Sequence, residues 1–554
     1  MSKYRYVLTI GGVCLVILCC DLTIQKAYAL AESTAQGGSN AQAVHQLGET
    51  GEDVNVGLIA ARNVLTTHEA FYDKDANGGP IGSTHAFNYD FSGDGIAPAS
   101  HDTWMAGIVA SRGGISYPDY IGVAPGADIH CARVADNNDV LYSYWLKDAL
   151  DELITGQGCK VIVTGLSLGK AIDPDGQSDW TLLYDYYAYH YNVIFADAAG
   201  NEITQISVFG DAYNGITTGG LDGDTEYVRV GSLSGSGPTS DGRRKPDVVA
   251  PSQNQTMPNA SANNSWYTWT TSGGHTSLSA PHTAGVAALL LGLADDTSDP
   301  NDSQNEIIRA VITNSTFPNI DDKSGSSTNP ADPNNVWHTQ RGYGRIDALR
   351  AYELLDSNQV FTDVNITDEK GWAFSAIAAQ WEHTYTIQAQ KHYRLVATLT
   401  WDRRVEWIDK RPYYIIDEGE LHPYLADLDL RIYEPNDANA IFSKQANGFD
   451  PDDNLIKCDI LLTASGQYTL KVVNNSTGET ADYGLAFELL PPLPGDFDLD
   501  YIVDYNDLRQ ITENWLQPAA GSDADLFQDD FIDFRDFALF AESWLTSDPA
   551  YHQD

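Results

Sequence analysis

Four short runs of apolar residues constrain the fold of this 554-residue chain more than any other feature. They read VNVGLIAA, DIHCARVA, KVIVTGLSL and NVIFADAAG, and none alternates regularly between apolar and polar residues. Continuous apolar runs are typical of strands buried on both faces, as in a parallel sheet that helices cover. The segments HDTWMAGIVAS and LYSYWLKDALDELI between them have the pattern of helices. We therefore expect an α/β domain with a mostly parallel sheet over residues 54–356.

The pattern changes after residue 356. RLVATLTW, LADLDLRIYEPN and GQYTLKVVNN alternate apolar and polar residues with a period of two. Leu428, Leu430 and Ile432 share one face, and Asp429 lies on the other. Such alternation without helical patterns predicts a β-sandwich over residues 357–490.

The last part of the chain, residues 491–554, contains an internal repeat. GDFDLDYIVDYNDLRQITENWL and ADLFQDDFIDFRDFALFAESWL superpose, so that Asp504 matches Asp533 and Trp515 matches Trp544. Each copy is an acidic loop followed by one amphipathic helix. We expect a small helical domain here.

The formal net charge of −45 limits the partners of the chain. A surface this acidic repels nucleic acid and anionic membranes, so we expect neither as a partner.

The N-terminus has the pattern of a secretory signal peptide. Lys3 and Arg5 precede an apolar run from Val7 to Cys20, and Ala27-Tyr28-Ala29 is a small-residue cleavage site. We expect residues 1–29 to be removed, residues 30–53 to form an N-terminal segment, and the mature protein to be extracellular. A lipoprotein anchored through Cys19 or Cys20 is the alternative.

Three cysteines remain after such a cleavage: Cys131, Cys159 and Cys458. Three are too few for a disulfide framework in a chain of this size. We expect small buried side chains, and a Cys131–Cys159 bridge is the alternative.

Ser277 lies where a glycine-rich turn, SGGHTS, runs into a long apolar helix that ends near Leu293. Backbone N–H groups at such a helix start can stabilise a developing oxyanion, which suits a nucleophilic serine. A serine that only caps the helix is the alternative from the local pattern.

Several motifs in order resemble the subtilisin-like serine proteases, the subtilases. HTSLSAPHTAG resembles their nucleophile motif, SHDTWMAGIVAS their histidine motif, and VIFADAAGNE the segment that carries an oxyanion-hole asparagine. YIGVAPGADI, VTGLSLG and DGRRKPDVVAP are also similar to subtilase segments. The chain departs from the family at Asp102 and Trp104, which replace a glycine and a histidine, and at His275, which replaces a glycine.

The resemblance implies a fold and a set of roles. The fold would be the subtilisin-like parallel-sheet catalytic domain. Ser277 would attack the peptide carbonyl, His101 would act as general base, and Asn201 would hold the oxyanion. The backbone of Ser167, Leu168 and Gly169 would pair with a protein or peptide substrate as an extra strand. His282, inside the nucleophile motif, is expected to be structural.

The acid of the family triad has no counterpart in the first strand. Ala60 stands at its position, and no acidic residue occurs from Val54 to His68. The open alternatives are a substitute acid at Glu69, Asp90 or Asp94, or no substitute at all. Asp102 is expected to be a poor substitute, because adjacent helix residues do not share a face. Without an acid, the fold would be an impaired peptide-binding module rather than an efficient endopeptidase.

The C-terminal repeat resembles a type I dockerin, a duplicated calcium-loop module that docks onto cohesin domains. Carboxylate and carbonyl oxygens at these spacings are suited to Ca²⁺. Phe527 replaces a ligand in the second loop, which should weaken that site. The ligands that the resemblance implies are Asp496, Asp498, Asp500, Ile502, Asp504 and Asp507 in the first loop, and Asp525, Asp529, Phe531, Asp533 and Asp536 in the second.

Overall fold

The structure of the protein is a computed structural model. It describes residues 9–10, 13–14, 30–95, 97–166, 172–202, 204–270, 273–297, 299–328, 336–409, 419–443, 453–499, 503–518 and 522–544. Apart from two paired strands, β1 (Thr9–Ile10) and β2 (Val13–Cys14), the expected signal peptide lies outside these residues.

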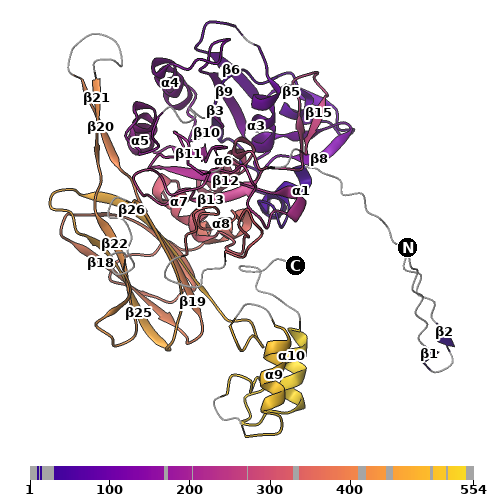
Figure 1. The fold of residues 1–554 in the computed structure, drawn as a ribbon, viewed down its shortest axis with the longest axis vertical. Coiled ribbons are helices and arrows are strands. Elements are labelled where there is room, and N and C mark those ends of the chain that lie inside the picture. The colour runs from indigo at the N-terminus through magenta and orange to yellow at the C-terminus, as the bar shows by residue number, and fades with distance from the viewer. Residues whose placement is uncertain are drawn as a thin grey trace.

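Seven parallel strands form the main sheet of an α/β domain (Figure 1), in the order β13-β12-β11-β10-β3-β9-β6. The four apolar runs of the sequence are the adjacent central strands of this sheet, so the predicted parallel sheet is confirmed. The strands are β3 (Asn55–Ala60), β6 (Ala86–Asp90), β9 (Asp128–Arg133), β10 (Val161–Thr164), β11 (Ile194–Ala198), β12 (Gly215–Leu221) and β13 (Val248–Pro251).

Helices cover both faces of this sheet. On one face, α3 (Ser100–Ala110) and α6 (Ala280–Asp295) share a hydrophobic core with Val56, Leu58 and Ala60 of β3. On the other face, α4 (Ser143–Leu150) and α5 (Asp179–Tyr191) share a second core with Ile59. The side chain at the end of β3, that of Ala60, therefore points to the face that carries α3.

The central core helix is unusually apolar. Among the residues that the structure describes, one helical stretch, Thr276–Asp295, is long and apolar enough to cross a membrane, and its residues 276–294 are all buried inside the domain. Burial on every side explains its composition.

The segment before β3 is part of the α/β domain. It forms α1 (Leu30–Thr34) and α2 (Ala41–Leu47), and Leu30, Ala41 and Val44 are fully buried. α2 packs against α8 (Ala348–Leu355), so the start and the end of the domain lie side by side. Smaller elements complete the domain: β4 (Tyr72–Lys74), β5 (Pro80–Thr84), β7 (Arg112–Gly114), β8 (Tyr117–Ile121), β14 (Gln255–Pro258), β15 (Trp266–Trp269) and α7 (Asn305–Asn314).

The three cysteines Cys131, Cys159 and Cys458 are free and buried. Cys131 lies in β9, opposite Leu58 of β3, and has no disulfide partner. The expectation of small buried side chains is therefore confirmed, and the bridge between Cys131 and Cys159 is absent.

The next part of the chain forms two sheets that share one hydrophobic core. Their orders are β16-β18-β25-β22-β23 and β17-β26-β19-β24. The strands are β16 (Asn365–Ile366), β17 (Lys370–Ile377), β18 (Glu382–Ala389), β19 (Arg394–Trp401), β22 (Leu428–Tyr433), β23 (Ala440–Ser443), β24 (Leu455–Leu461), β25 (Gly466–Asn474) and β26 (Ala481–Leu490).

One strand of this two-sheet region differs from its simple alternation. Leu428, Leu430 and Ile432 are buried as the pattern indicates, but Asp429 is fully buried as well. Arg431 Nε donates to its carboxylate at 2.7 Å, and Ser443 Oγ donates at 3.1 Å. Local partners thus satisfy a buried charge that the sequence pattern places on an exposed face.

The two-sheet region packs tightly on the α/β domain. α7 lies against β19 and β26, and Arg309 of α7 binds Asp402 at 2.6 Å. A hairpin of β20 (Arg404–Asp409) and β21 (Gly419–Tyr424) extends along α5 (Figure 1).

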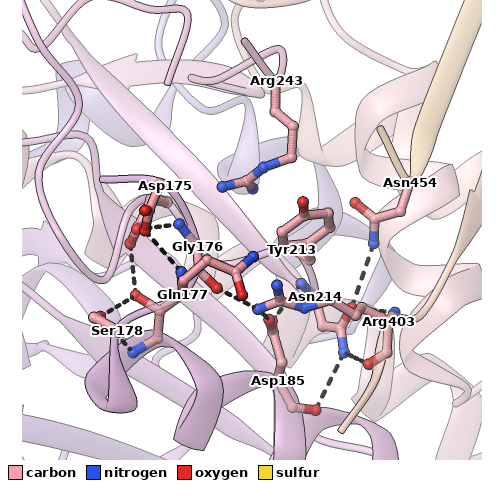
Figure 2. A network of polar contacts seen from close by, with 12 residues as sticks. Asp175, Gly176, Gln177, Ser178, Asp185, Tyr213, Asn214, Arg243, Arg403 and Asn454 are labelled. Atoms are coloured by element: carbon pink, nitrogen blue, oxygen red, sulfur yellow. Dashed lines mark hydrogen bonds and ion pairs between the residues drawn. The ribbon is translucent and has the colours of Figure 1, made fainter. Parts of the chain in front are cut away.

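A buried polar network joins these two parts around Arg403 (Figure 2). The Arg403 guanidinium pairs with Asp185 of α5 and donates to the Gly176 carbonyl at 2.8 Å. Its carbon Cζ lies 3.8 Å from the ring centre of Tyr213. Asn214 binds both the N–H and the carbonyl of Arg403, each at 2.8 Å. The side chain of Arg403 is almost fully buried, so the two parts form a continuous interior here.

Two short helices, α9 (Tyr505–Glu513) and α10 (Phe534–Glu542), lie side by side at the end of the chain (Figure 1). They enclose a small hydrophobic core of their own, which includes Ile511 and Phe540. Asp504 and Asp533 cap the N-termini of the two helices in the same way, as the internal repeat requires.

Candidate active site

Ser277 and His101 meet where α3 and α6 begin. Ser277 lies in a 3₁₀ turn, Thr276–Leu278, directly before α6, and His101 is the second residue of α3. His101 Nε2 lies 2.9 Å from Ser277 Oγ. A neutral imidazole at this distance can accept the hydroxyl proton as the oxygen attacks a carbonyl.

Asn201 follows β11 and lies beside the same turn. The Asn201 side-chain oxygen accepts a hydrogen bond from the Thr276 N–H at 3.0 Å, and Thr276 Oγ1 lies 3.3 Å from it. Since the oxygen end is held by Thr276, the Nδ2 end is the one that can donate to a substrate oxygen. This orientation suits an oxyanion-hole donor next to the Ser277 N–H.

The end of β10 approaches Ser277 closely. A Cβ atom added at Gly165 would lie 2.8 Å from the Ser277 Cβ and 2.6 Å from the Met105 sulfur. Only glycine fits in this space, because any other side chain would displace α3 or the turn that holds Ser277. Ser167, Leu168 and Gly169, the expected substrate-binding residues, follow directly but lie outside the described residues.

The carboxyl ends of β10 and β11 therefore converge on one serine and one histidine. The sequence model of the subtilase family (peptidase S8) matches residues 76–344. This part of the chain is therefore similar to the subtilases. The match takes in His101, Asn201 and Ser277 within one domain.

The curated relatives of the chain are proteases whose sequence identity to it is low. The human membrane-bound transcription factor site-1 protease is 26% identical over 327 residues, 57% of this chain and 26% of its own length. Pyrolysin of Pyrococcus furiosus is 28% identical over 42% of this chain and 18% of its own length. Subtilisin E of Bacillus subtilis is 28% identical over 48% of this chain and 63% of its own length.

The chain thus spans about a quarter of the length of the curated relatives it matches first. Among solved structures, the prenylagaramide maturation protease PagA is 20% identical, covers 57% of this chain and 98% of its own, and has a TM-score of 0.42. The matching family model and these relatives are those of subtilisin-like proteases.

The α/β domain has no carboxylate at the end of β3. Ala60 is the last residue of that strand, and its methyl group is buried in the core that contains Met105 of α3. Arg62, two residues later, turns away from the site and binds Asp139 at 2.6 Å.

Three acids that were open as substitutes are bound elsewhere. Glu69 accepts a hydrogen bond from the Trp266 indole at 3.0 Å. Asp90 accepts from Ser92 and Gly95 in its own loop, and Asp94 accepts from the Asn137 N–H at 2.7 Å. Among the residues that the structure describes, no ion pair joins any of these three carboxylates to His101.

Asp102 is closer to His101 than its position in the helix indicates. Its Oδ1 lies 3.7 Å from His101 Nδ1, and its side chain is only 3% exposed. Asp102 thus faces His101 although adjacent helix residues do not share a face, at a distance longer than a hydrogen bond. The near ring nitrogen, Nδ1, is separated from Cβ by a single ring carbon, so it stays within reach of the neighbouring residue while Nε2 extends to Ser277.

Two further histidines surround the turn. His282 is fully buried in α6, and burial lowers its pKa to about 3. Its Nε2 lies 3.3 Å from Gln255 Oε1, away from the catalytic pair, which suits a structural role. His275 packs edge-on against Trp269, and burial together with the nearby His101 lowers the pKa of His275.

A second candidate site lies in the first acidic loop of the C-terminal repeat. Asp496, Asp498 and Asp507 place carboxylate oxygens within 4.8 Å of one another. Asp507 also accepts from the Phe497 N–H at 2.6 Å and the Asp504 N–H at 2.8 Å, which holds the loop on the start of α9. Carboxylate oxygens are the kind of hard ligand that Ca²⁺ takes in proteins. Two more expected ligands lie outside the described residues: Asp500 and Ile502.

The second acidic loop is arranged differently. Arg535 binds Asp529 at 2.6 Å and Asp533 at 2.8 Å, so an internal cation occupies two of the expected ligands. Asp525 and Asp536 accept backbone N–H groups of the loop, and Phe531 forms a bridge with Pro518. This loop fits a cation less well than the first.

Proposed function

We propose that this protein is a secreted serine endopeptidase that hydrolyses peptide bonds in proteins, with Ser277 as nucleophile and His101 as general base. The 2.9 Å contact between Ser277 Oγ and His101 Nε2 inside a subtilase domain carries the proposal. Secretion rests on the signal peptide expected at residues 1–29.

The reaction follows from this geometry. Ser277 Oγ attacks the peptide carbonyl carbon while its proton passes to His101 Nε2, and the carbonyl electron pair moves to the oxygen. The N–H of Ser277 and the Asn201 amide donate to that oxyanion. When the tetrahedral intermediate collapses, the C–N bond breaks and His101 returns the proton to the leaving amine. Water, activated by His101, then hydrolyses the acyl-enzyme in the same way.

The substrate backbone would lie along residues Ser167–Gly169. They follow Gly165, whose close approach to Ser277 brings the end of β10 to the nucleophile. An extended peptide that pairs there as an additional strand would present its carbonyl to Ser277.

We infer that the C-terminal repeat is a dockerin-like module that binds Ca²⁺ and docks onto a cohesin-like domain of another extracellular protein. The grouping of Asp496, Asp498 and Asp507 supports a cation in the first loop, because their carboxylate oxygens lie close enough together to bind one ion. Docking would hold the peptidase at a cell surface or in a larger assembly.

One observation favours a second candidate function, an impaired subtilase fold that binds peptides without efficient turnover. Ala60 leaves the strand end without the carboxylate that the family resemblance implies, and Asp102 lies 3.7 Å from His101 Nδ1, longer than a hydrogen bond.

Covalent labelling separates the two functions. A fluorophosphonate probe should react with the wild-type protein, and peptide mapping should place the adduct on Ser277. Ser277→Ala is the matched control and should not be labelled. An unlabelled wild-type protein that still binds peptides would establish the peptide-binding function instead.

A further inference from the structure

We propose that Asp102 is the positioning residue that orients His101 in place of the carboxylate missing at position 60. The inference rests on the proposed peptidase function of Ser277 and His101. It assigns the role of the triad acid to the residue directly after the histidine.

The two ring nitrogens of His101 face different partners. Nε2 lies 2.9 Å from Ser277 Oγ, and Nδ1 lies 3.7 Å from Asp102 Oδ1. A carboxylate beside Nδ1 favours the tautomer with the proton on that nitrogen, so that Nε2 is free to accept the serine proton. Among the residues that the structure describes, Asp102 is the one carboxylate within 4 Å of either nitrogen.

The two side chains differ in exposure in the way this role requires. The Asp102 side chain is 3% exposed, whereas the His101 side chain is 43% exposed. A buried carboxylate interacts with an imidazolium more strongly than one in water. Asp102 also lies in the first turn of α3, where the N–H groups of the helix stabilise a negative charge.

A neighbouring thiol shows how close this carboxylate is to the core. The pKa of Cys131, in β9, is raised well above its ordinary value by burial and further by the charge of Asp102. Asp102 thus points inward, to the face of the sheet on which β3 ends at Ala60.

The distance between Asp102 and His101 is only slightly longer than a hydrogen bond. At 3.7 Å, Asp102 Oδ1 and His101 Nδ1 are about 0.7 Å beyond hydrogen-bond length, and catalytic hydrogen bonds often shorten when substrate binds. His275 is half-buried and near His101, and it cannot stabilise an imidazolium.

Position 60 offers an independent test that leaves Asp102 unchanged. The side chain of Ala60 shares the core that contains Met105 of α3, and the Asn63 carbonyl accepts from the Ala99 N–H at 2.9 Å, just before His101. A carboxylate introduced at Ala60 therefore lies on the side of β3 that faces the histidine.

The experiment compares Asp102→Asn, Ala60→Asp, the double variant of both, and Glu69→Gln with the wild type. Hydrolysis of a peptide ester gives kcat and KM, fluorophosphonate labelling reports Ser277, and thermal melting reports folding. Glu69→Gln is the matched control, because it removes a carboxylate that binds Trp266 instead of His101.

If Asp102 orients His101, Asp102→Asn lowers kcat about 10²-fold or more and leaves KM within about threefold of the wild-type value. The reason is that the loss of a triad acid lowers kcat by up to about 10⁴-fold. The double variant recovers at least about tenfold of that loss. Ala60→Asp alone changes kcat less than about threefold, and Glu69→Gln behaves as the wild type.

Two results would overturn the inference while leaving the peptidase function intact: a kcat within threefold of the wild type in Asp102→Asn, or an increase of about 10²-fold in Ala60→Asp alone. Equal losses in Asp102→Asn and the double variant would also contradict it. A wild-type protein that is neither labelled nor active overturns the proposed function and this inference together.

Discussion

His101 Nε2 and Ser277 Oγ lie 2.9 Å apart, although 176 positions separate the two residues in the chain. The contact exists because α3 and α6 cover the same face of the parallel sheet and both begin at the edge where β10 and β11 end. Ligand and catalytic sites of parallel α/β sheets usually lie at this edge.

We predict that Ser277→Ala and His101→Ala each lower the hydrolysis of a peptide ester by at least about 10²-fold. The first removes the nucleophile and the second removes its base. Because the two residues act as a unit, the double variant should be no worse than the single ones. Turnover in either variant at the wild-type rate would place the chemistry elsewhere.

Asn201→Ala should lower kcat by about 10²- to 10³-fold with little change in KM. The Asn201 amide would stabilise the oxyanion, which exists only in the transition state and the intermediate. Steady-state kinetics on a peptide ester provide the measurement. A rise in KM at constant kcat would instead assign Asn201 to substrate binding.

Arg403→Met should destabilise the protein by about 3–5 kcal/mol, because it leaves the buried Asp185 carboxylate without its cation. Arg404→Met is the matched control. Arg404 is about one third exposed and binds Glu406 and Glu479 near the surface, so its loss should cost less than about 1 kcal/mol. Denaturant unfolding of both variants measures the difference. Equal midpoints would show that the buried pair adds no net stability.

The buried Lys457 predicts how the free energy of unfolding depends on pH. It reaches from β24 to the end of α7 and donates to the carbonyls of Thr313 and Asn314. Burial lowers the pKa of Lys457 to about 7, from an ordinary value of 10.5. Between these values the unfolded chain binds one more proton than the folded protein, so the contribution of Lys457 to the free energy of unfolding rises with pH.

Lys457→Met should remove this dependence. The free energy of unfolding of the wild type, minus that of Lys457→Met, should rise by up to about 1.4 kcal/mol per pH unit between about pH 7.5 and 9.5. Denaturant titrations of both proteins across this window test the sign. A difference that stays constant would mean that Lys457 remains protonated in the folded protein.

The acidic repeat predicts two unequal Ca²⁺ sites. Asp507 and Asp536 cap their helices in the same way, so Asp507→Asn and Asp536→Asn remove equal capping and differ in the metal site they affect. We expect titration calorimetry of the full chain to show a tighter site that is lost in Asp507→Asn. Asp536→Asn should affect only the weaker site, in which Arg535 already occupies two carboxylates. No binding heat after removal of Ca²⁺ by a chelator and its readdition would contradict the calcium proposal.

Much of the α/β domain was predictable because its strands are buried on both faces. VNVGLIAA and KVIVTGLSL carry apolar residues at consecutive positions, which is typical of a covered parallel sheet, and they form the adjacent strands β3 and β10. The motifs around His101 and Ser277 could also be recognised from the sequence, because each consists of residues that are consecutive in the chain.

The relation between His101 and Asp102 was not predictable from spacing. Successive helix residues point about 100° apart, which argues against a contact between them. The structure reverses this because the ring of His101 turns its near nitrogen to Asp102, while the approach of α6 draws its far nitrogen to Ser277. A rotamer depends on neighbours from distant parts of the chain, and local periodicity carries no information on them.

The sequence alone therefore determined the parallel sheet, the order of the motifs and the repeat of the last helices, since each depends on residues near one another in the chain. Only the tertiary structure decided that Glu69 binds Trp266 rather than His101, that Arg403 and Asp185 join the two-sheet region to α5, and that Leu30 is buried in the α/β domain. These relations depend on which surfaces meet when the chain closes, and burial there gives charged and apolar groups partners that lie hundreds of positions away.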